Sequence, residues 1–121
     1  MATILVVEDD EHLRVLMEEW LILEKYSVVA CCTGQEALER LKALYFDAIV
    51  LDWHLPDTTG PEVLRKYRAS GGTSPVFLLT GSSGKTDKQE ALDAGATDFL
   101  HKPFKLSKLS AILAEQIARK V

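Results

Sequence analysis

Polar side chains that could do chemistry follow four short apolar segments of this 121-residue chain. An acidic run, Glu8-Asp9-Asp10, follows the first of these segments, and Asp52 follows another. A hydroxyl, Thr80, and a lysine, Lys102, follow two more. If the segments are parallel strands of one sheet, their carboxyl ends lie at the same edge, which is where open α/β sheets bind ligands. The sequence therefore predicts one cluster of acids, a hydroxyl and an ammonium group.

Such a cluster suits a divalent cation and a phosphoryl group. Carboxylates within a few ångströms raise one another's pKa, and a bound cation removes that cost. A small set of hard oxygen ligands favours Mg²⁺. Lys102 and the cation would form a positive pocket, and Thr80 could donate a hydrogen bond to a phosphoryl oxygen. A carboxylate can itself be the nucleophile and form an aspartyl-phosphate, and such transfer depends mostly on positioning and charge neutralisation.

The strands that must position these residues can be recognised by their hydropathy. Continuous apolar segments, short and rich in β-branched residues, cover residues 4–7, 28–32, 48–51 and 76–79, and a weaker segment covers 97–101. Continuous rather than alternating apolar runs are typical of strands that are covered on both faces, as in parallel sheets.

Amphipathic helices are predicted between and after these strands. Apolar residues recur at helical spacing over residues 13–21, 33–45, 59–67 and 86–94, and again after residue 107. Thr33 and Thr59, each followed three residues later by Glu, begin two helices as capping boxes. The helix over 86–94 offers only Ala91, Leu92 and Ala94 to a core, so we expect it to be held least firmly. The alternation of strand and helix predicts a three-layer α/β sandwich.

Composition limits the classes of protein to which the chain can belong. A length of 121 residues indicates a single domain, 1–121, and a net charge of −4 argues against direct nucleic-acid binding. No apolar run approaches the roughly 18 residues that span a membrane, and no secretion signal precedes residue 4, so we expect a cytoplasmic domain. Two adjacent cysteines, Cys31 and Cys32, are expected to be buried free thiols, and residues 65–68 a solvated helix face.

Taken together, the motifs resemble the receiver domain of two-component response regulators. The matching segments are Val6-Val7-Glu8-Asp9, Leu51-Asp52-Trp53-His54-Leu55-Pro56, Leu79-Thr80-Gly81 and Phe99-Leu100-His101-Lys102-Pro103-Phe104. The resemblance covers essentially the whole chain. It implies a flavodoxin-like, doubly wound (βα)5 three-layer sandwich whose five parallel strands lie in the order 2-1-3-4-5. It also implies a cis peptide bond between Lys102 and Pro103.

The resemblance assigns a Mg²⁺ site and a phosphoacceptor. Asp52 is the implied phosphoacceptor and also a metal ligand. The spacing from the acidic run to Arg14 makes Glu8 and Asp9 the metal pair, with Asp9 a direct ligand and Glu8 acting mainly through water. The backbone carbonyl of His54 completes the implied ligand set. Asp10 falls outside the pair and is expected at a helix amino terminus.

The remaining motif residues are implied to contact or sense the phosphoryl group. Lys102 resembles the lysine that contacts the phosphoryl group, and Thr80 resembles the switch hydroxyl. Gly81 is implied to contact the phosphoryl group through its backbone. Phe99 stands where the family has its switch aromatic and lacks the hydroxyl of the commoner tyrosine.

The implied function is a phosphoacceptor switch in a phosphorelay, not an enzyme with its own substrate. A sensor histidine kinase or a histidine phosphotransfer protein would phosphorylate Asp52, and the domain would take part only in its own phosphoryl transfer and autodephosphorylation. The signal would pass through the face formed by the helix 86–94, the strand 97–101 and the last helix. That face also allows a homodimer. Output, and any contact with DNA, would belong to a partner or to another segment.

Two alternative functions differ in class. A phosphorylation-independent interaction module could use the same fold, although the intact set of acids, Thr80 and Lys102 argues against it. A phosphatase of the haloacid-dehalogenase type also uses an aspartyl-phosphate, but it needs an Asp-x-Asp motif. Here the residue two positions after Asp52 is His54, and we expect no cap domain within these 121 residues that could form a substrate pocket.

Overall fold

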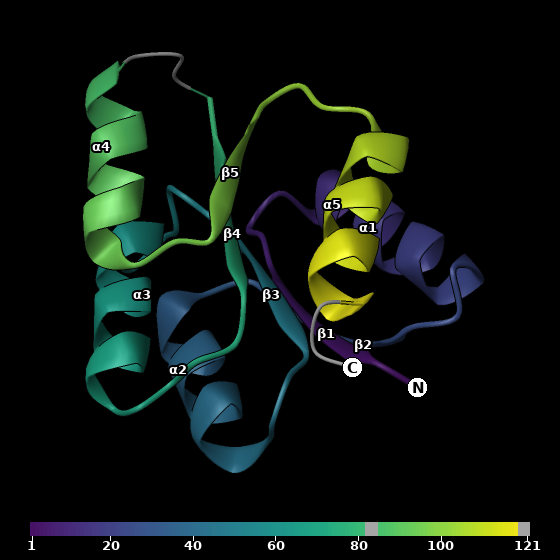
Figure 1. The fold of residues 1–121 in the computed structure, drawn as a ribbon, viewed down its shortest axis with the longest axis horizontal. Coiled ribbons are helices and arrows are strands. Elements are labelled where there is room, and N and C mark those ends of the chain that lie inside the picture. The colour runs from purple at the N-terminus through teal and green to yellow at the C-terminus, as the bar shows by residue number, and fades with distance from the viewer. Residues whose placement is uncertain (82–84, 119–121) are drawn as a thin grey trace.

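Strands and helices alternate along the chain, and the computed structural model describes residues 1–81 and 85–118 (Figure 1). The strands are β1 (Thr3–Val7), β2 (Ser27–Cys31), β3 (Ala48–Asp52), β4 (Val76–Thr80) and β5 (Asp98–His101). The helices are α1 (Glu11–Leu23), α2 (Gly34–Ala43), α3 (Gly60–Ala69), α4 (Lys85–Ala94) and α5 (Leu106–Ala118).

The strands form one parallel sheet in the order β2-β1-β3-β4-β5, which confirms the predicted flavodoxin-like (βα)5 fold. Val7 pairs with Leu51, and Asp52 pairs with Leu79. The residues that end or follow β1, β3 and β4 therefore meet at one edge of the sheet, the upper edge in Figure 1. The strand order reverses between β1 and β3, where sheets of this kind open a crevice for ligands.

Helices cover both faces of the sheet, as a three-layer sandwich requires. Helices α1 and α5 lie on one face, and α2, α3 and α4 lie on the other (Figure 1). Residues of β1 alternate between the two cores, Ile4 and Val6 packing beneath α1 and α5 and Leu5 and Val7 beneath the other helices. Burial on both faces explains the continuous apolar runs. None of the described helices is long and apolar enough to cross a membrane.

Side chains cap the amino termini of three helices. The hydroxyls of Thr33 and Thr59 accept hydrogen bonds from the backbone N–H groups three residues on, at 3.1 and 3.4 Å. Glu36 Oε1 accepts from the N–H of Cys32 at 3.2 Å, one residue before the position that a capping box predicts. Asp10 caps α1 by accepting from the N–H three residues on at 3.1 Å, as expected for an acid outside the metal pair.

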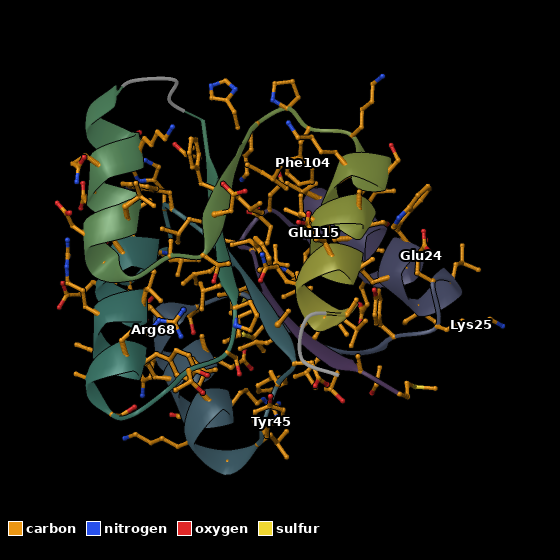
Figure 2. All side chains as sticks on the ribbon, viewed as in Figure 1. Glu24, Lys25, Tyr45, Arg68, Phe104 and Glu115 are labelled. Atoms are coloured by element: carbon orange, nitrogen blue, oxygen red, sulfur yellow. The ribbon has the colours of Figure 1, made fainter. Side chains whose placement is uncertain are left out.

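Helix α2 is shorter than its apolar pattern predicts. The helix ends at Ala43, and Leu44 already has an extended backbone, with φ −134° and ψ 151°. Leu44 and Tyr45 are therefore 49% and 66% exposed, and Tyr45 lies beyond the end of α2 (Figure 2). Phe46, which is buried at the start of the approach to β3, requires the chain to leave the helix at this point.

Helix α4 contributes little to the core. Ala91 and Ala94 are buried, but Leu92, which the pattern assigns to the core, is 49% exposed. Two methyl groups remove far less apolar surface from water than the leucine and methionine side chains of the other helices do. That α4 is the helix held least firmly stays a prediction, supported by the small apolar surface that its described side chains bury.

The basic segment 65–68 and the cysteine pair each divide between surface and interior. Arg65 and Lys66 are exposed, as predicted, but Arg68 is half-buried and donates hydrogen bonds to backbone carbonyls of other segments.

Cys31 is a buried free thiol, whose pKa burial raises to about 12, whereas Cys32 is exposed. At the end of the edge strand β2, successive side chains point to opposite sides, so only one of the pair reaches the core.

Candidate functional site

The predicted cluster forms at the carboxyl edge of the sheet. Glu8 and Asp9 follow β1, Asp52 and Thr80 are the last residues of β3 and β4, and Lys102 follows β5. One carboxylate oxygen from each of Glu8, Asp9 and Asp52 lies within 4.8 Å of the other two. The topology therefore brings together the three acids that sequence analysis assigned to metal binding, and leaves Asp10 at its helix cap.

The three acids differ in exposure. Glu8 is fully buried and Asp52 is 5% exposed, while Asp9 is exposed. Both oxygens of Glu8 already have partners, since Oε1 lies 2.8 Å from Lys102 Nζ and Oε2 accepts from the N–H of Asp10 at 3.1 Å. Arg14 Nη1 donates to the backbone carbonyl of Glu8 at 3.0 Å, which fixes the turn after β1.

Lys102 joins two of the acids. Its Nζ lies 2.8 Å from Glu8 Oε1 and 2.9 Å from Asp52 Oδ1. Its backbone N–H donates to the carbonyl of Thr80 at 2.6 Å, and the Lys102–Pro103 peptide bond is cis, as predicted. Lys102 follows β5, and its ammonium group thus lies between acids at the ends of β1 and β3.

Burial and pairing set the electrostatics of this cluster. Burial raises the pKa of the Glu8 carboxyl to about 7, against hydrogen bonds from Lys102 and Asp10 that favour its charged form. Burial opposes the charge on Lys102, but its hydrogen bonds to Glu8 and Asp52 outweigh this effect and raise its pKa. The cluster contains three carboxylates and one ammonium group, which leaves an excess of negative charge. The carboxylate oxygens are hard ligands, and this combination of ligand type and charge fits Mg²⁺.

Thr80 ends β4, the strand next to β3, Gly81 follows it, and Phe99 lies on β5, where it pairs with Leu78. Thr80 is 2% exposed, and its hydroxyl donates to Asp87 Oδ2 of α4 at 3.2 Å. Gly81 is exposed directly after β4. Phe99 of β5 is half-buried and packs against the core beneath α2, α3 and α4.

The loop after β3 holds His54 at the site. The His54 side chain is exposed, while its backbone pairs with Thr59 in an isolated antiparallel bridge. Leu55 N–H donates to the Thr58 carbonyl at 3.1 Å and closes the turn. Trp53, next to Asp52, is 6% exposed.

Three further residues shape the site without belonging to any motif in the sequence. Asp57 accepts from the N–H groups of Gly34 and Gln35, each at 2.9 Å, so the loop after β3 caps α2. Gly60 N–H donates to the Trp53 carbonyl at 2.7 Å. Asp87 accepts from Thr80, as described above. Their partners are 7 to 23 positions away, and no short motif joins the two members of each pair.

A groove among the described residues lies away from this cluster. This groove of about 690 Å³ runs between the carboxyl-terminal ends of α2 and α3, with Leu41, Phe46 and Tyr67 in its wall. The edge that carries the acids is instead open to solvent at Asp9. A site for a hydrated cation and for a phosphoryl group delivered by another protein does not require a deep cavity.

Comparison with known proteins agrees with this geometry. A family model described as the response regulator receiver domain matches residues 4–114. Response regulator ArlR of Staphylococcus aureus is 39% identical over 111 residues, which are 92% of this chain and 50% of the relative. The chain thus spans half the length of the curated relatives that it matches.

Solved structures are similar over nearly all of their length. The receiver domain of Francisella response regulator 1452 superposes with a TM-score of 0.96 at 26% identity and covers 100% of both chains. The receiver domain of sensor histidine kinase PA1611 from Pseudomonas aeruginosa PAO1, with a magnesium ion coordinated in its active site cleft, gives a TM-score of 0.89 at 32% identity. That match covers 97% of this chain and 98% of the other.

The region matched by the family model contains the carboxyl end of each described strand and the site residues that end or follow these strands. The strand order, the acidic cluster at the carboxyl edge and the lysine before a cis proline all lie within it. Sequence, fold and site therefore lead to one conclusion, that this chain belongs to the response regulator receiver domains, the signalling domains of two-component systems.

Proposed function

We propose that residues 1–121 form a Mg²⁺-dependent phosphoacceptor domain that is phosphorylated on Asp52. The observation that carries the proposal is the environment of Asp52. Its carboxylate is nearly buried, lies 2.9 Å from the ammonium group of Lys102, and shares an edge with Glu8 and Asp9. A carboxylate held in this way is positioned as a nucleophile, with charges nearby that can neutralise a phosphoryl group.

In the proposed step, one carboxylate oxygen of Asp52 attacks the phosphorus of a phosphohistidine. A new O–P bond forms, the P–N bond breaks, and its electron pair returns to the imidazole. Lys102, 2.9 Å from Asp52, meets the added negative charge, and Thr80 and the backbone of Gly81 donate hydrogen bonds to the phosphoryl oxygens. In autodephosphorylation a water molecule attacks the same phosphorus and releases phosphate, which restores the Asp52 carboxylate.

Glu8, Asp9, Asp52 and the backbone carbonyl of His54 are the groups that would hold Mg²⁺. The ion supplies neutralisation of charge on the phosphoryl oxygens. Exposed Asp9 is suited to direct coordination, whereas both oxygens of Glu8 are engaged by Lys102 and by Asp10, which suits contact through water. The magnesium ion in the active site cleft of the PA1611 receiver domain supports this assignment.

The proposed partner is a sensor histidine kinase or a histidine phosphotransfer protein in the cytoplasm. The proposed output face is formed by α4, β5 and α5, since the buried residues among the described side chains of α4 are two alanines and we expect this helix to shift at small cost. The same face would support a homodimer. A net charge of −4 makes this domain a poor ligand for nucleic acid, so DNA contacts would belong to another domain or partner.

Incubation with acetyl phosphate and Mg²⁺, followed by intact mass spectrometry, tests the proposal. The wild-type chain is expected to gain one phosphoryl group, and Asp52→Asn none, because the amide is not a nucleophile. Asp93→Asn, a change to an exposed carboxylate on α4, is the matched control and should gain the group normally. The same gain in Asp52→Asn would contradict the proposal.

The same samples separate the alternative functions. Two results together would favour a phosphorylation-independent interaction module. The wild-type chain would gain no phosphoryl group, and its Trp53 fluorescence would not change when Mg²⁺ is added. Steady release of product from a generic phosphate ester would favour a phosphatase. His54 stands where that class needs a second acid, so no turnover is expected.

A further inference from the structure

The hydroxyl of Thr80 is already in use in this structure. Thr80 Oγ1 donates a hydrogen bond to Asp87 Oδ2 at 3.2 Å. Thr80 is the last residue of β4 and is 2% exposed, whereas Asp87 is in the first turn of α4 and is half-buried. The bond therefore connects the sheet edge that carries Asp52 to the amino-terminal end of α4.

A threonine hydroxyl has one proton and can donate one strong hydrogen bond at a time. A carboxylate is a charged acceptor, and hydrogen bonds to charged acceptors are stronger than those to neutral groups. If Thr80 is to donate to a phosphoryl oxygen on Asp52, its proton must leave Asp87. The two acceptors, one on α4 and one on Asp52, therefore compete for the same donor.

Other polar contacts of α4 lie farther along the helix, so the hydrogen bond from Thr80 to Asp87 matters for the position of its first turn. Near its middle, Glu90 forms an exposed ion pair with Arg65 at 3.7 Å, which contributes little. At its carboxyl-terminal end, Arg68 donates two hydrogen bonds to the carbonyl of Gly95, at 3.0 and 2.9 Å. Helix α4 is thus anchored firmly beyond its last turn, and Asp87 fixes its first turn to β4.

We propose that Asp87 is a positioning residue that holds the Thr80 hydroxyl away from Asp52 until a phosphoryl group competes for it. The inference rests on the proposed function, because it gives Thr80 its phosphoryl contact. Transfer of the hydrogen bond from Asp87 to the phosphoryl oxygen frees the first turn of α4 while Arg68 keeps the other end in place. Asp87 thereby opposes phosphorylation and couples it to the position of α4.

A simpler role for Asp87 makes a different prediction. An acid in the first turn stabilises a helix through the helix dipole, whatever Thr80 does. Its charge would also repel a phosphoryl group from a distance. Neither effect needs the Thr80 hydroxyl, so both would persist in a chain that lacks it, whereas competition for the proton would not.

The test is a double-mutant cycle on the rate of phosphorylation by acetyl phosphate with Mg²⁺, followed by intact mass. Asp87→Ala is expected to raise the rate about ten- to hundredfold, the range for one hydrogen bond to a charged group. In a Thr80→Val background, which keeps the shape of the side chain, Asp87→Ala should change nothing. Asp93→Ala on the same helix is the control and should leave the rate unchanged. An unchanged or lower rate in Asp87→Ala, or an equal increase in both backgrounds, would overturn the inference.

A second measurement needs no phosphorylation. Amide exchange in the described part of the first turns of α4, residues 85–90, should quicken several-fold in Thr80→Val and in Asp87→Ala. Because one hydrogen bond is lost in either case, the double variant should exchange no faster than Asp87→Ala. Fully additive effects, or no effect of Thr80→Val, would overturn the inference. A wild-type chain that accepts no phosphoryl group but shows this pattern would instead refute the proposed function alone.

Discussion

Glu8 is a carboxyl group in a position that is unfavourable for charge. Its side chain is fully buried, and burial raises its pKa to about 7 from an ordinary value of 4.5, despite the hydrogen bond from Lys102. The folded state therefore binds more protons than the unfolded chain between these two values. Since stability falls with pH where the folded state binds more protons, the free energy of unfolding of the metal-free protein should decrease from about pH 4.5 to 7.

Chemical denaturation in EDTA at a series of pH values measures this decrease, which amounts to about 3 kcal/mol at most. Glu8→Gln keeps the shape and removes the titration, so its stability should be flatter over the same range. Acids elsewhere, such as Asp57, whose pKa is lowered by hydrogen bonds from Gly34 and Gln35, remain in both chains and cancel in the comparison. Equal slopes in the two chains would contradict the prediction.

Gly60 shows how closely one residue can constrain the position of Asp52. A Cβ at Gly60 would lie 2.4 Å from the backbone oxygen of Asp52, and backbone cannot move aside as a side-chain end can. Gly60→Ala should therefore lower the free energy of unfolding by about 2–3 kcal/mol, measured by denaturation. Gly81→Ala is the control, since its Cβ would meet none of the described atoms within 4 Å, and should cost under about 0.5 kcal/mol. A neutral Gly60→Ala would show that α3 can shift away from β3.

At the scale of elements, Arg68 ties α3 to the ends of two other segments. Figure 2 shows Arg68 extending from α3. Its guanidinium donates to the carbonyls of Gly95, Gly72 and Ser74, the last two at 3.2 and 2.7 Å. Burial lowers its pKa, and its hydrogen-bond partners among the described residues are carbonyl dipoles, so its role is to satisfy backbone groups that precede β4 and follow α4.

Arg68→Ala should lower the free energy of unfolding by about 2–4 kcal/mol, because three carbonyls lose a charged donor at once. Arg65→Ala, on the same helix, removes only ion pairs whose side chains are 43–48% exposed, and should cost under about 0.5 kcal/mol. Denaturant titrations compare the two. A similar small cost for both would mean that Arg68 lies on a solvated face, as the sequence alone suggested.

Arg68 also shows where prediction from the sequence stops. Parallel topology and apolar runs were enough to place Glu8, Asp52, Thr80 and Lys102 at one edge, because each lies directly after or at the end of a strand. Arg68 looks like any basic residue on a helix, since its partners are backbone carbonyls that carry no sequence signal. The early end of α2, which exposes Tyr45, likewise depends on burial elsewhere and not on local propensity.

At the scale of the whole molecule, the sheet separates two layers of helices. On one face α1 and α5 bury large side chains such as Met17, Leu21 and Leu113, while on the other face the buried residues among the described side chains of α4 are Ala91 and Ala94. The acidic edge lies above both layers and is bonded to each of them, through Arg14 of α1 and through Asp87 of α4. We therefore expect a change of charge at this edge to shift α4 more readily than α1.

That edge also makes the stability of the whole domain depend on cations. Three carboxylates face one ammonium group, so Mg²⁺ should bind the folded chain more tightly than the unfolded one and raise the melting temperature by several degrees. Asp9→Asn should raise the melting temperature in EDTA, because repulsion falls, and should abolish most of the response to Mg²⁺. Asp10→Asn is the matched control, since asparagine caps a helix as well as aspartate does, and should keep the full response. Thermal scans with and without Mg²⁺ measure the two responses. Loss of the response in Asp10→Asn instead would mean that the metal pair is Asp9 and Asp10 and not Glu8 and Asp9.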